Sequence, residues 1–233
     1  MTLVVFDFET TGFKGNHAVE LAAVIYSQDG QAYTYHSKCK PASPIEDTAF
    51  AIHGISNAMV DNERPDTEVV AEFWNDIQEL HNPALGPIVL GGHNSAFDIR
   101  VLRKYLPVPM DTPVLCTMRL GRLYSPEAEN HKLTTLHAHL GCTGAYQAHS
   151  ALDDCYMSYN ILKHYMDKLG LGYLDLALGQ SKPVTLKIMP FGKHKGESFS
   201  VVPAGYMWYM LGMSDIDADV AYNFRQELAR RSA

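Results

Sequence analysis

The stretch that decides the fold lies near the start of the chain, at residues 3–9, and reads Leu3-Val4-Val5-Phe6-Asp7-Phe8-Glu9. Four apolar residues lead into an acid–aromatic–acid sequence, which predicts a buried strand that ends in polar groups. Because residues two apart on a strand point to the same side of the sheet, we expect Asp7 and Glu9 to project together. Two adjacent carboxylates repel each other unless a cation or a proton compensates them. On its own, this short pattern also fits an exposed strand end whose acids are solvated and have no function.

The sequence that follows predicts further strands and helices in an order typical of α/β proteins. Strands are expected at residues 19–26, 31–38, 87–91 and 112–115. Helices are expected at residues 67–80 and 151–169, where apolar residues recur at three- and four-residue steps, and at residues 96–105, after the apolar strand at 87–91. The pair Asp29-Gly30 between the first two of these strands favours a hairpin. A hairpin followed by strand–helix alternation implies an α/β fold whose sheet has mixed strand directions.

The composition of the chain excludes several classes of protein. With 233 residues, of which 46% are hydrophobic, the chain can bury one sizeable core, so disorder is not expected. No apolar run approaches the length of a membrane span, and the first twenty residues lack the pattern of a secretory signal. None of the four cysteines stands in a C-x-x-C pair, which predicts reduced thiols rather than a zinc site. We therefore expect a cytoplasmic protein with no membrane partner.

A change in composition after residue 172 predicts two units. Residues 1–172 are expected to form the main domain, 173–183 a glycine-containing linker, and 184–233 a small C-terminal α+β unit. That unit would hold a strand at 184–189 and helices at 203–211 and 219–230. Residues 182–233 carry a formal charge of +2 within a chain of −7, which leaves −9 on the remainder. The acidic main part argues against a broad DNA clamp and is compatible with a pocket for divalent cations.

A second polar segment follows the apolar strand at 87–91 and reads His93-Asn94-Ser95-Ala96-Phe97-Asp98. Strand-to-helix crossings of α/β proteins are common places for functional sites. A structural interpretation is that Asn94 or Ser95 caps the helix and that Asp98 is a favourable acid in its first turn. The two interpretations are compatible, since a capped helix start is a rigid mount for a ligand.

A third segment opens the helix at 151–169 and reads His149-Ser150-Ala151-Leu152-Asp153-Asp154. Two acids compete here for one functional role. Ser150 and Asp153 have the spacing of a capping box, which predicts a structural role for Asp153 at the helix start. Asp154 lies nearer to the apolar stripe of the helix than Asp153 does. We therefore assign Asp154, rather than Asp153, to a metal.

The three segments together, in this order, resemble the DnaQ-like superfamily of 3′→5′ exonucleases, whose four acids and histidine give the label DEDDh. Within it the chain is most similar to the exodeoxyribonuclease X group. The supporting stretches are 50–55, 116–120, 149–156, 191–193 and 205–208. The resemblance implies an RNase H-like mixed sheet flanked by helices, and a hydrolase of phosphodiester bonds.

The resemblance also implies a site built from Asp7, Glu9, Asp98, His149 and Asp154. Asp7, Glu9 and Asp154 would ligate one Mg²⁺ or Mn²⁺, and Asp7 and Asp98 a second. Hard divalent cations prefer oxygen ligands, and two of them about 4 Å apart can stabilise both oxygens of an in-line displacement. His149 would deprotonate the attacking water, a role that suits an imidazole. Weaker assignments to the terminal nucleotide are Thr10, His53, Asn94 and Phe97, with Phe8 or Phe97 stacking on bases.

Single-stranded or frayed DNA 3′ ends are the expected substrate, and the product would be nucleoside 5′-monophosphates. The same fold acting on RNA, as in RNase T-like or oligoribonuclease-like enzymes, is the nearest alternative, because recognition of the 2′-OH depends on pocket shape. A different class is a proofreading or scaffold subunit docked to a polymerase. Residues 184–233 could bind DNA, or a polymerase or repair partner, without performing chemistry. The turn Lys193-His194-Lys195 is a solvated turn or a phosphate contact.

Overall fold

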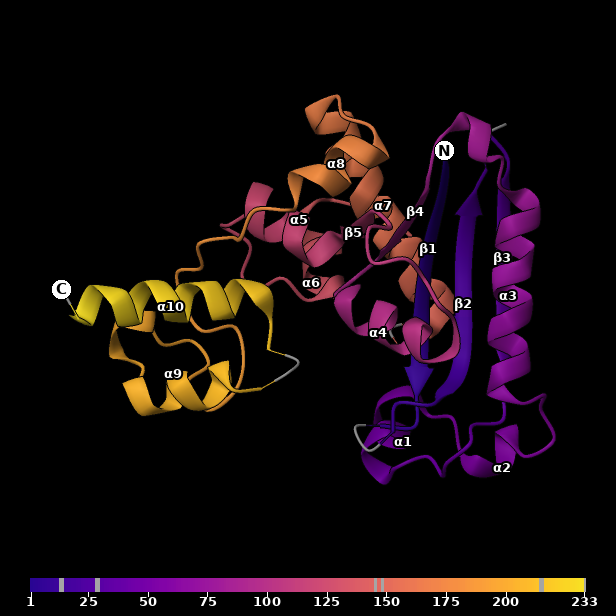
Figure 1. Cartoon of the computed structure of the whole chain (residues 1–233), viewed down its shortest axis with the longest axis horizontal. Helices are drawn as coiled ribbons and strands as arrows, with labels where there is room; N and C mark the ends of the chain where they lie inside the picture. The colour runs from indigo at the N-terminus through magenta and orange to yellow at the C-terminus, as the bar shows by residue number, and fades with distance from the viewer. Residues whose placement is uncertain (13–14, 28–29, 145, 148, 214–215, 233) are drawn as a thin grey trace.

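A five-stranded mixed sheet forms the centre of the molecule, with strand order β3-β2-β1-β4-β5 (Figure 1). The structure is a computed structural model and describes residues 1–12, 15–27, 30–144, 146–147, 149–213 and 216–232. The strands are β1 (Thr2–Thr10), β2 (Ala18–Tyr26), β3 (Ala32–Lys38), β4 (Ile88–Gly92) and β5 (Val114–Cys116). Strand β1 pairs antiparallel with β2 and parallel with β4. The predicted mixed sheet flanked by helices is confirmed.

The sequence predicts five of the ten helices in the described residues, those at 66–80, 96–105, 151–169, 204–211 and 218–232, and the other five were not expected. The ten are α1 (Asp47–His53), α2 (Asn57–Val60), α3 (Asp66–Leu80), α4 (Ala96–Tyr105), α5 (Thr117–Tyr124), α6 (Leu133–His139), α7 (Ala151–Leu169), α8 (Tyr173–Gly179), α9 (Ala204–Leu211) and α10 (Ala218–Ser232), with 3₁₀ turns η1 (Pro83–Leu85) and η2 (Phe199–Val201). Helices α4 and α7 have the predicted bounds. Residues 28–29 lie outside the described residues, and with them the expected hairpin turn at Asp29-Gly30.

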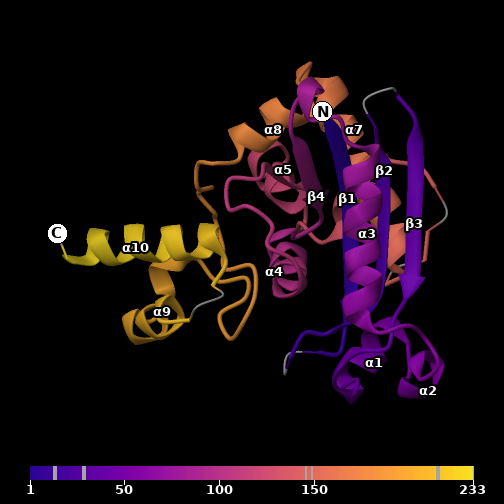
Figure 2. The ribbon, with the colours of Figure 1, turned by 45° about the vertical axis from the view of Figure 1, so that its right-hand side comes forward.

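The two faces of the sheet carry separate cores. Helices α3 and α4 cover one face, where they pack against Val4, Phe6 and Phe8 of β1. Helices α5 to α8 cover the other face, together with Leu3 and Val5. Figure 2 shows α3 in front of the sheet and α7 behind it. Because side chains alternate along a strand, Asp7 and Glu9 continue the row of Leu3 and Val5 and project toward the α7 side.

A glycine at the end of β4 permits close approach of the two central strands beside these acids. A Cβ atom on Gly92 would lie 2.8 Å from the carbonyl oxygen of Phe6, a separation that real Cβ atoms do not show. Phe6 immediately precedes Asp7, so any larger residue at position 92 would displace the strand that carries the first carboxylate. Here the absence of a side chain is a requirement of packing rather than of backbone conformation.

The C-terminal unit stands to one side of the sheet in both ribbon views (Figures 1 and 2). It has a core of its own, made by Met189, Phe199, Val202, Met207, Val220, Phe224 and Leu228. The predicted helices are present as α9 and α10. The predicted strand at 184–189 is wrong: within this described stretch, Ile188 forms an isolated bridge with Ser198 and no ladder follows. The linker expected at 173–183 is also wrong in its first part. Residues 173–179 form α8, whose Leu176 and Ala177 are buried in the main core.

A buried ion-pair network joins the C-terminal unit to α5. Arg122 donates to Asp217 at 2.9 Å and to Asp219 at 2.8 Å, while Arg119 donates to Asp219 at 3.0 Å. The side chain of Asp219 is 1% exposed, and it also accepts a hydrogen bond from the backbone N–H of Val184. Charges removed from water are tolerated when each finds an opposite partner and further hydrogen bonds. The network therefore holds the start of α10 against the main domain.

The remaining sequence expectations concern thiols and membranes. All four cysteines are free, and Cys39, Cys116 and Cys155 are buried. Among the helices of the described residues, none combines the length and the apolar character needed to cross a bilayer.

Candidate active site

Three potential ligand groups meet where β1 ends beside the start of α7. One ligand atom each from Glu9, His149 and Asp154 lies within 4.8 Å of the others. Glu9 comes from the end of β1, and Asp154 from the first turn of α7. His149 precedes α7 and is exposed, with a left-handed backbone of φ 64°. Residues 140 positions apart thus share one site because α7 packs on the sheet face to which Glu9 points.

Asp98 reaches the same site from the other neighbour of β1. It lies in the first turn of α4, directly after β4, and is 2% exposed. Its Oδ1 accepts a hydrogen bond from the backbone N–H of Phe8 at 3.1 Å, between the two acids of β1. Asn94, at φ 59°, turns the chain from β4 into α4. The turn therefore aims Asp98 at the strand that carries Asp7 and Glu9.

The carboxylates lie close enough to disturb one another's ionisation. Burial, with the charges of Asp154 and Glu20, raises the pKa of Asp7 to about 8. Burial and the charge of Asp7 raise the pKa of Glu9 to about 9. Burial and Asp7 likewise place the pKa of Asp98 well above its usual value. The site therefore favours protons or bound cations over a set of bare carboxylates.

Asp154 supplies a specific sign that these residues fit a metal. Its Oδ1 is buried and has no hydrogen-bond partner among the described residues. Burial raises the pKa of Asp154 to about 6, although His149 opposes the rise through its charge and a backbone hydrogen bond. A buried carboxylate oxygen without a partner is costly, and a cation would satisfy it. The donor set, carboxylates with one imidazole, suits Mg²⁺ or Mn²⁺.

Asp153 has a structural role, but a different one from the capping box predicted for it. Ser150 is the N-cap of α7, yet its side chain makes no capping hydrogen bond to a described residue. Asp153 Oδ2 instead accepts a hydrogen bond from the backbone N–H of Gln147 at 2.8 Å. The carboxylate thus holds the segment before the helix, to which His149 belongs. Asp154 points to the acidic cluster, as assigned.

The five weaker assignments have different outcomes. The prediction that Phe8 stacks on bases is wrong, because its ring is 4% exposed and packs edge-to-face on Phe6 at 5.9 Å. Phe97 is half-buried, and Asn94 is exposed. His53 binds the carbonyl oxygen of the buried Thr10 at 3.2 Å, so both residues lie at the end of β1. Burial lowers the pKa of His53.

One acid beside the site, Glu20, was not among the residues singled out in the sequence. It is 6% exposed and stands opposite Glu9 in the β1–β2 ladder. Its Oε2 accepts a hydrogen bond from the backbone N–H of Ala151 at 3.3 Å, and its Oε1 lies 3.0 Å from His36 Nε2. Glu20 therefore ties the first residue of α7 to the sheet. The sequence feature that could have identified Glu20 is its position as an acid inside an otherwise apolar strand.

Comparison with known proteins adds a family match over most of this architecture. Residues 4–162 match the model of the exonuclease family (RNase_T). That range runs from β1 into α7 and contains all five residues of the predicted catalytic set. Helices α8 to α10 lie beyond the match.

Three similar proteins illustrate the range of the likeness. A DNA polymerase III subunit epsilon-like protein of Rhodobacter capsulatus is 34% identical over 66% of this chain and 22% of its own length. A PolC-type DNA polymerase III of Thermotoga petrophila is 30% identical over 75% of this chain, which spans 13% of that relative. A solved structure of exonuclease X in complex with 5′ overhanging duplex DNA superposes with a TM-score of 0.60 and 28% identity, covering 75% of this chain and 99% of the other.

Proposed function

This chain belongs to the exonuclease family, and we propose that it removes nucleotides from the 3′ ends of single-stranded or frayed DNA. Its enzyme class is that of a nuclease, a hydrolase of phosphodiester bonds, of the DnaQ-like DEDDh type. The observation that carries the proposal is the convergence of Glu9, His149 and Asp154 within 4.8 Å, with an unpartnered carboxylate oxygen among them. Asp7 and Asp98 complete the acidic set.

The side chains divide the chemistry between cation binding and proton transfer. Asp7, Glu9, Asp98 and Asp154 would hold two divalent cations, Mg²⁺ or Mn²⁺. When bound, such cations supply positive charge where the phosphate and the leaving 3′ oxygen become negative. His149, exposed at the rim, would take a proton from the water that attacks phosphorus. The bond to the 3′ oxygen breaks, so the nucleotide leaves as a 5′-monophosphate and the shortened strand keeps a 3′-hydroxyl.

The placement of the remaining residues supports a strand end as substrate. The half-buried Phe97 would contact a base. Thr10 ends β1, His53 contacts its carbonyl oxygen, and Asn94 lies in the turn into α4. DNA is favoured by the likeness to exonuclease X, whose solved complex contains duplex DNA with a 5′ overhang. The 3′ strand of such a duplex is recessed, which presents a 3′ end.

A second candidate role, proofreading beside a polymerase, is favoured by the relatives that carry polymerase III names. This chain spans less than a quarter of either relative, so the remainder of those proteins has no counterpart in the match. Association with a polymerase would need a surface outside the catalytic cluster. Analytical gel filtration of the chain with a purified replicative polymerase would decide this role.

The decisive experiment for the main proposal is digestion of a 5′-labelled oligonucleotide in Mg²⁺. The wild-type chain should produce a ladder of products, each one nucleotide shorter, and a matched RNA oligonucleotide should be cut more slowly. Excess EDTA or Asp7→Ala should abolish the ladder. Full activity of Asp7→Ala, or products that start from the 5′ end, would overturn the proposal, and faster RNA cleavage would transfer it to RNA.

A further inference from the structure

We infer that the groove between α9 and α10 is a second nucleic-acid contact, where Trp208 stacks on a base and Arg225 binds a phosphate of single-stranded DNA. This inference rests on the proposed function, since it supplies the region that would hold the strand upstream of the cleaved 3′ end. It concerns residues after 162, which lie outside the family match.

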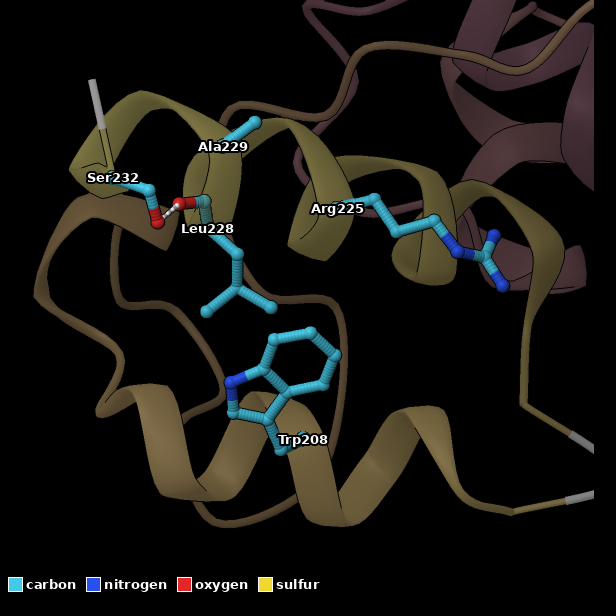
Figure 3. Close-up of a pocket in the computed structure, with 5 residues that line it drawn as sticks. All are labelled: Trp208, Arg225, Leu228, Ala229 and Ser232. Atoms are coloured by element: carbon cyan, nitrogen blue, oxygen red, sulfur yellow. Dashed lines mark hydrogen bonds between the residues drawn. The ribbon is translucent and has the colours of Figure 1, made fainter.

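Trp208 presents a large aromatic surface to solvent. Its side chain is 64% exposed, although a tryptophan is more often covered in a folded domain. It lines a pocket of about 320 Å³ together with Arg225, Leu228, Ala229 and Ser232 of α10. Figure 3 shows the indole ring facing Leu228, with Arg225 further along α10. The groove therefore has an aromatic ring on α9, while Arg225 on the α10 side of its lining extends away from that ring along the helix.

The charges of the C-terminal unit are distributed so that cations remain unpaired. All four of its described acids are engaged: Glu197 with His194, Glu227 with two arginines, and Asp217 and Asp219 with α5. By contrast, no described residue forms an ion pair or a hydrogen bond with the side chain of Lys182, Lys187, Lys193, Lys195 or Arg225. The surface left by this pairing is cationic, and an anionic polymer is its complement.

The groove is attached firmly to the main domain. Asp219, near the start of α10, is fixed to α5 by the buried network, so the groove cannot move freely against the main domain. Arg225 is six residues further along the helix, and Ser232 is at the outer end. The main part of the chain is acidic, at −9 for residues 1–181, so its net charge does not favour the phosphates of a longer strand.

Single-stranded nucleic acid is the occupant that this chemistry favours. Stacking on aromatic rings combined with phosphate contacts is the usual mode for unpaired strands and needs no base sequence. An anionic membrane would match the cations but would not need a single aromatic ring lining a pocket. A second copy of this chain is the other candidate occupant, because its acidic main domain could match the cations. Such a dimer would cover the groove even when no DNA is present, and this can be tested.

Intrinsic fluorescence can report on this groove directly, because the chain contains two tryptophans and the other, Trp74, packs partly buried against the main core. In a Trp74→Phe background, Trp208 is the sole tryptophan. Titration with oligo(dT) in EDTA, where no cleavage occurs, should quench its emission. In the same titration Trp208→Phe, which leaves Trp74 alone, should show no comparable change.

Binding of a labelled 20-mer should weaken on the order of tenfold in Trp208→Ala, as expected for one lost stacking contact. Arg225→Ala should weaken binding too and reduce the salt slope of log K by about 0.7, the value for one phosphate on a single strand. Matched controls are Tyr33→Ala, another exposed aromatic, and Lys163→Ala, another exposed cation, and both should bind as the wild type does.

Several outcomes would overturn the inference. One is unquenched Trp208 emission at oligonucleotide concentrations that saturate the chain. Another is emission that changes with protein concentration alone, which would assign the groove to a second copy. The cleavage assay tests the proposed function separately. A product ladder without quenching of Trp208 would reject the DNA contact in the groove and support the exonuclease activity. Quenching without a ladder would support the contact and reject the activity. A preference for oligo(U) over oligo(dT) would overturn the choice of DNA.

Discussion

Asp98 Oδ1 accepts a hydrogen bond from the backbone N–H of Phe8 at 3.1 Å, joining residues 90 positions apart in the chain. The contact fixes a buried carboxylate to the backbone that joins Asp7 to Glu9, so Asp98 serves the fold and the site at once. Asp98→Asn keeps an acceptor oxygen of the same shape. It should fold normally and lose nuclease activity, because the charge that holds a cation is gone.

Asp98→Ala should in addition destabilise the protein by about 1–3 kcal/mol, the cost of leaving a buried N–H without an acceptor. Urea unfolding followed by circular dichroism measures this difference between the two variants. Equal stability of Asp98→Asn and Asp98→Ala would show that the Phe8 contact contributes nothing, whereas an active Asp98→Asn would remove the acid from the catalytic set.

Asp153 and Asp154 offer a matched pair, since they are neighbours of identical chemistry with different partners. Asp154→Ala should reduce the cleavage rate at least about a hundredfold, because several kcal/mol of charge stabilisation depend on a bound cation. Asp153→Ala should retain most of the activity and lose the contact to Gln147. Initial rates over a range of Mg²⁺ concentrations separate the two, and an inverted order would exchange their assignments.

His149→Ala should lower kcat by about 10²–10⁴-fold, the range for a lost general base. The carboxylates remain in this variant, so binding of DNA and of Mn²⁺ should change little. Single-turnover cleavage and isothermal titration of Mn²⁺ test the two statements separately. A variant that loses Mn²⁺ affinity instead of rate would make His149 a ligand, which its position within 4.8 Å of Glu9 and Asp154 also permits geometrically.

The raised pKa values of Asp7, to about 8, and of Glu9, to about 9, predict how the metal-free protein responds to pH. Because both lie above the unfolded values, the folded protein binds more protons than the unfolded chain from about pH 4 to pH 9. The melting temperature without metal should therefore fall as pH rises through this window. Added Mg²⁺ should raise it more at about pH 8.5 than at about pH 5.5, since the cation takes the place of the protons.

Asp7→Asn supplies the control for this effect. Removing one of the repelling charges should flatten the pH dependence of the metal-free protein and weaken the response to Mg²⁺. Differential scanning fluorimetry in EDTA, with and without Mg²⁺, measures both. A melting temperature that climbs with pH in the metal-free wild type would contradict the assignment of protons to these carboxylates.

Asp219 is the centre of the network that attaches the C-terminal unit. Asp219→Ala should destabilise the chain by about 3–5 kcal/mol, since it leaves Arg122 and Arg119 short of a buried partner. Arg230, whose side chain is 65% exposed, is the control, and Arg230→Ala should change stability little because Glu227 keeps its ion pair with Arg231. Chemical denaturation compares them, and limited proteolysis should cut Asp219→Ala between the main domain and α9. Unchanged resistance to protease would mean that other contacts attach the unit.

Local sequence patterns predicted the five strands of the sheet and five of the ten helices in the described residues. The bounds of α4 and α7 followed from them, as did the projection of Asp7 and Glu9 to a common side, because these properties depend on residues near one another in the sequence. The strand expected at 184–189 failed for the complementary reason: a strand needs a partner, and local pattern cannot show that Ile188 finds a single bridge.

What the sequence by itself determined is therefore the α/β class, the acid pair on β1 and the residue types that can hold a cation. Only the tertiary structure decided that Phe8 is a core residue rather than a stacking surface, and that Glu20 anchors the start of α7. It also brought Asp154, which the helix pattern already favoured over Asp153, within 4.8 Å of Glu9 and His149. These facts depend on which elements pack together, and packing is set by contacts between residues far apart in the chain, which a local pattern of polar and apolar residues does not contain.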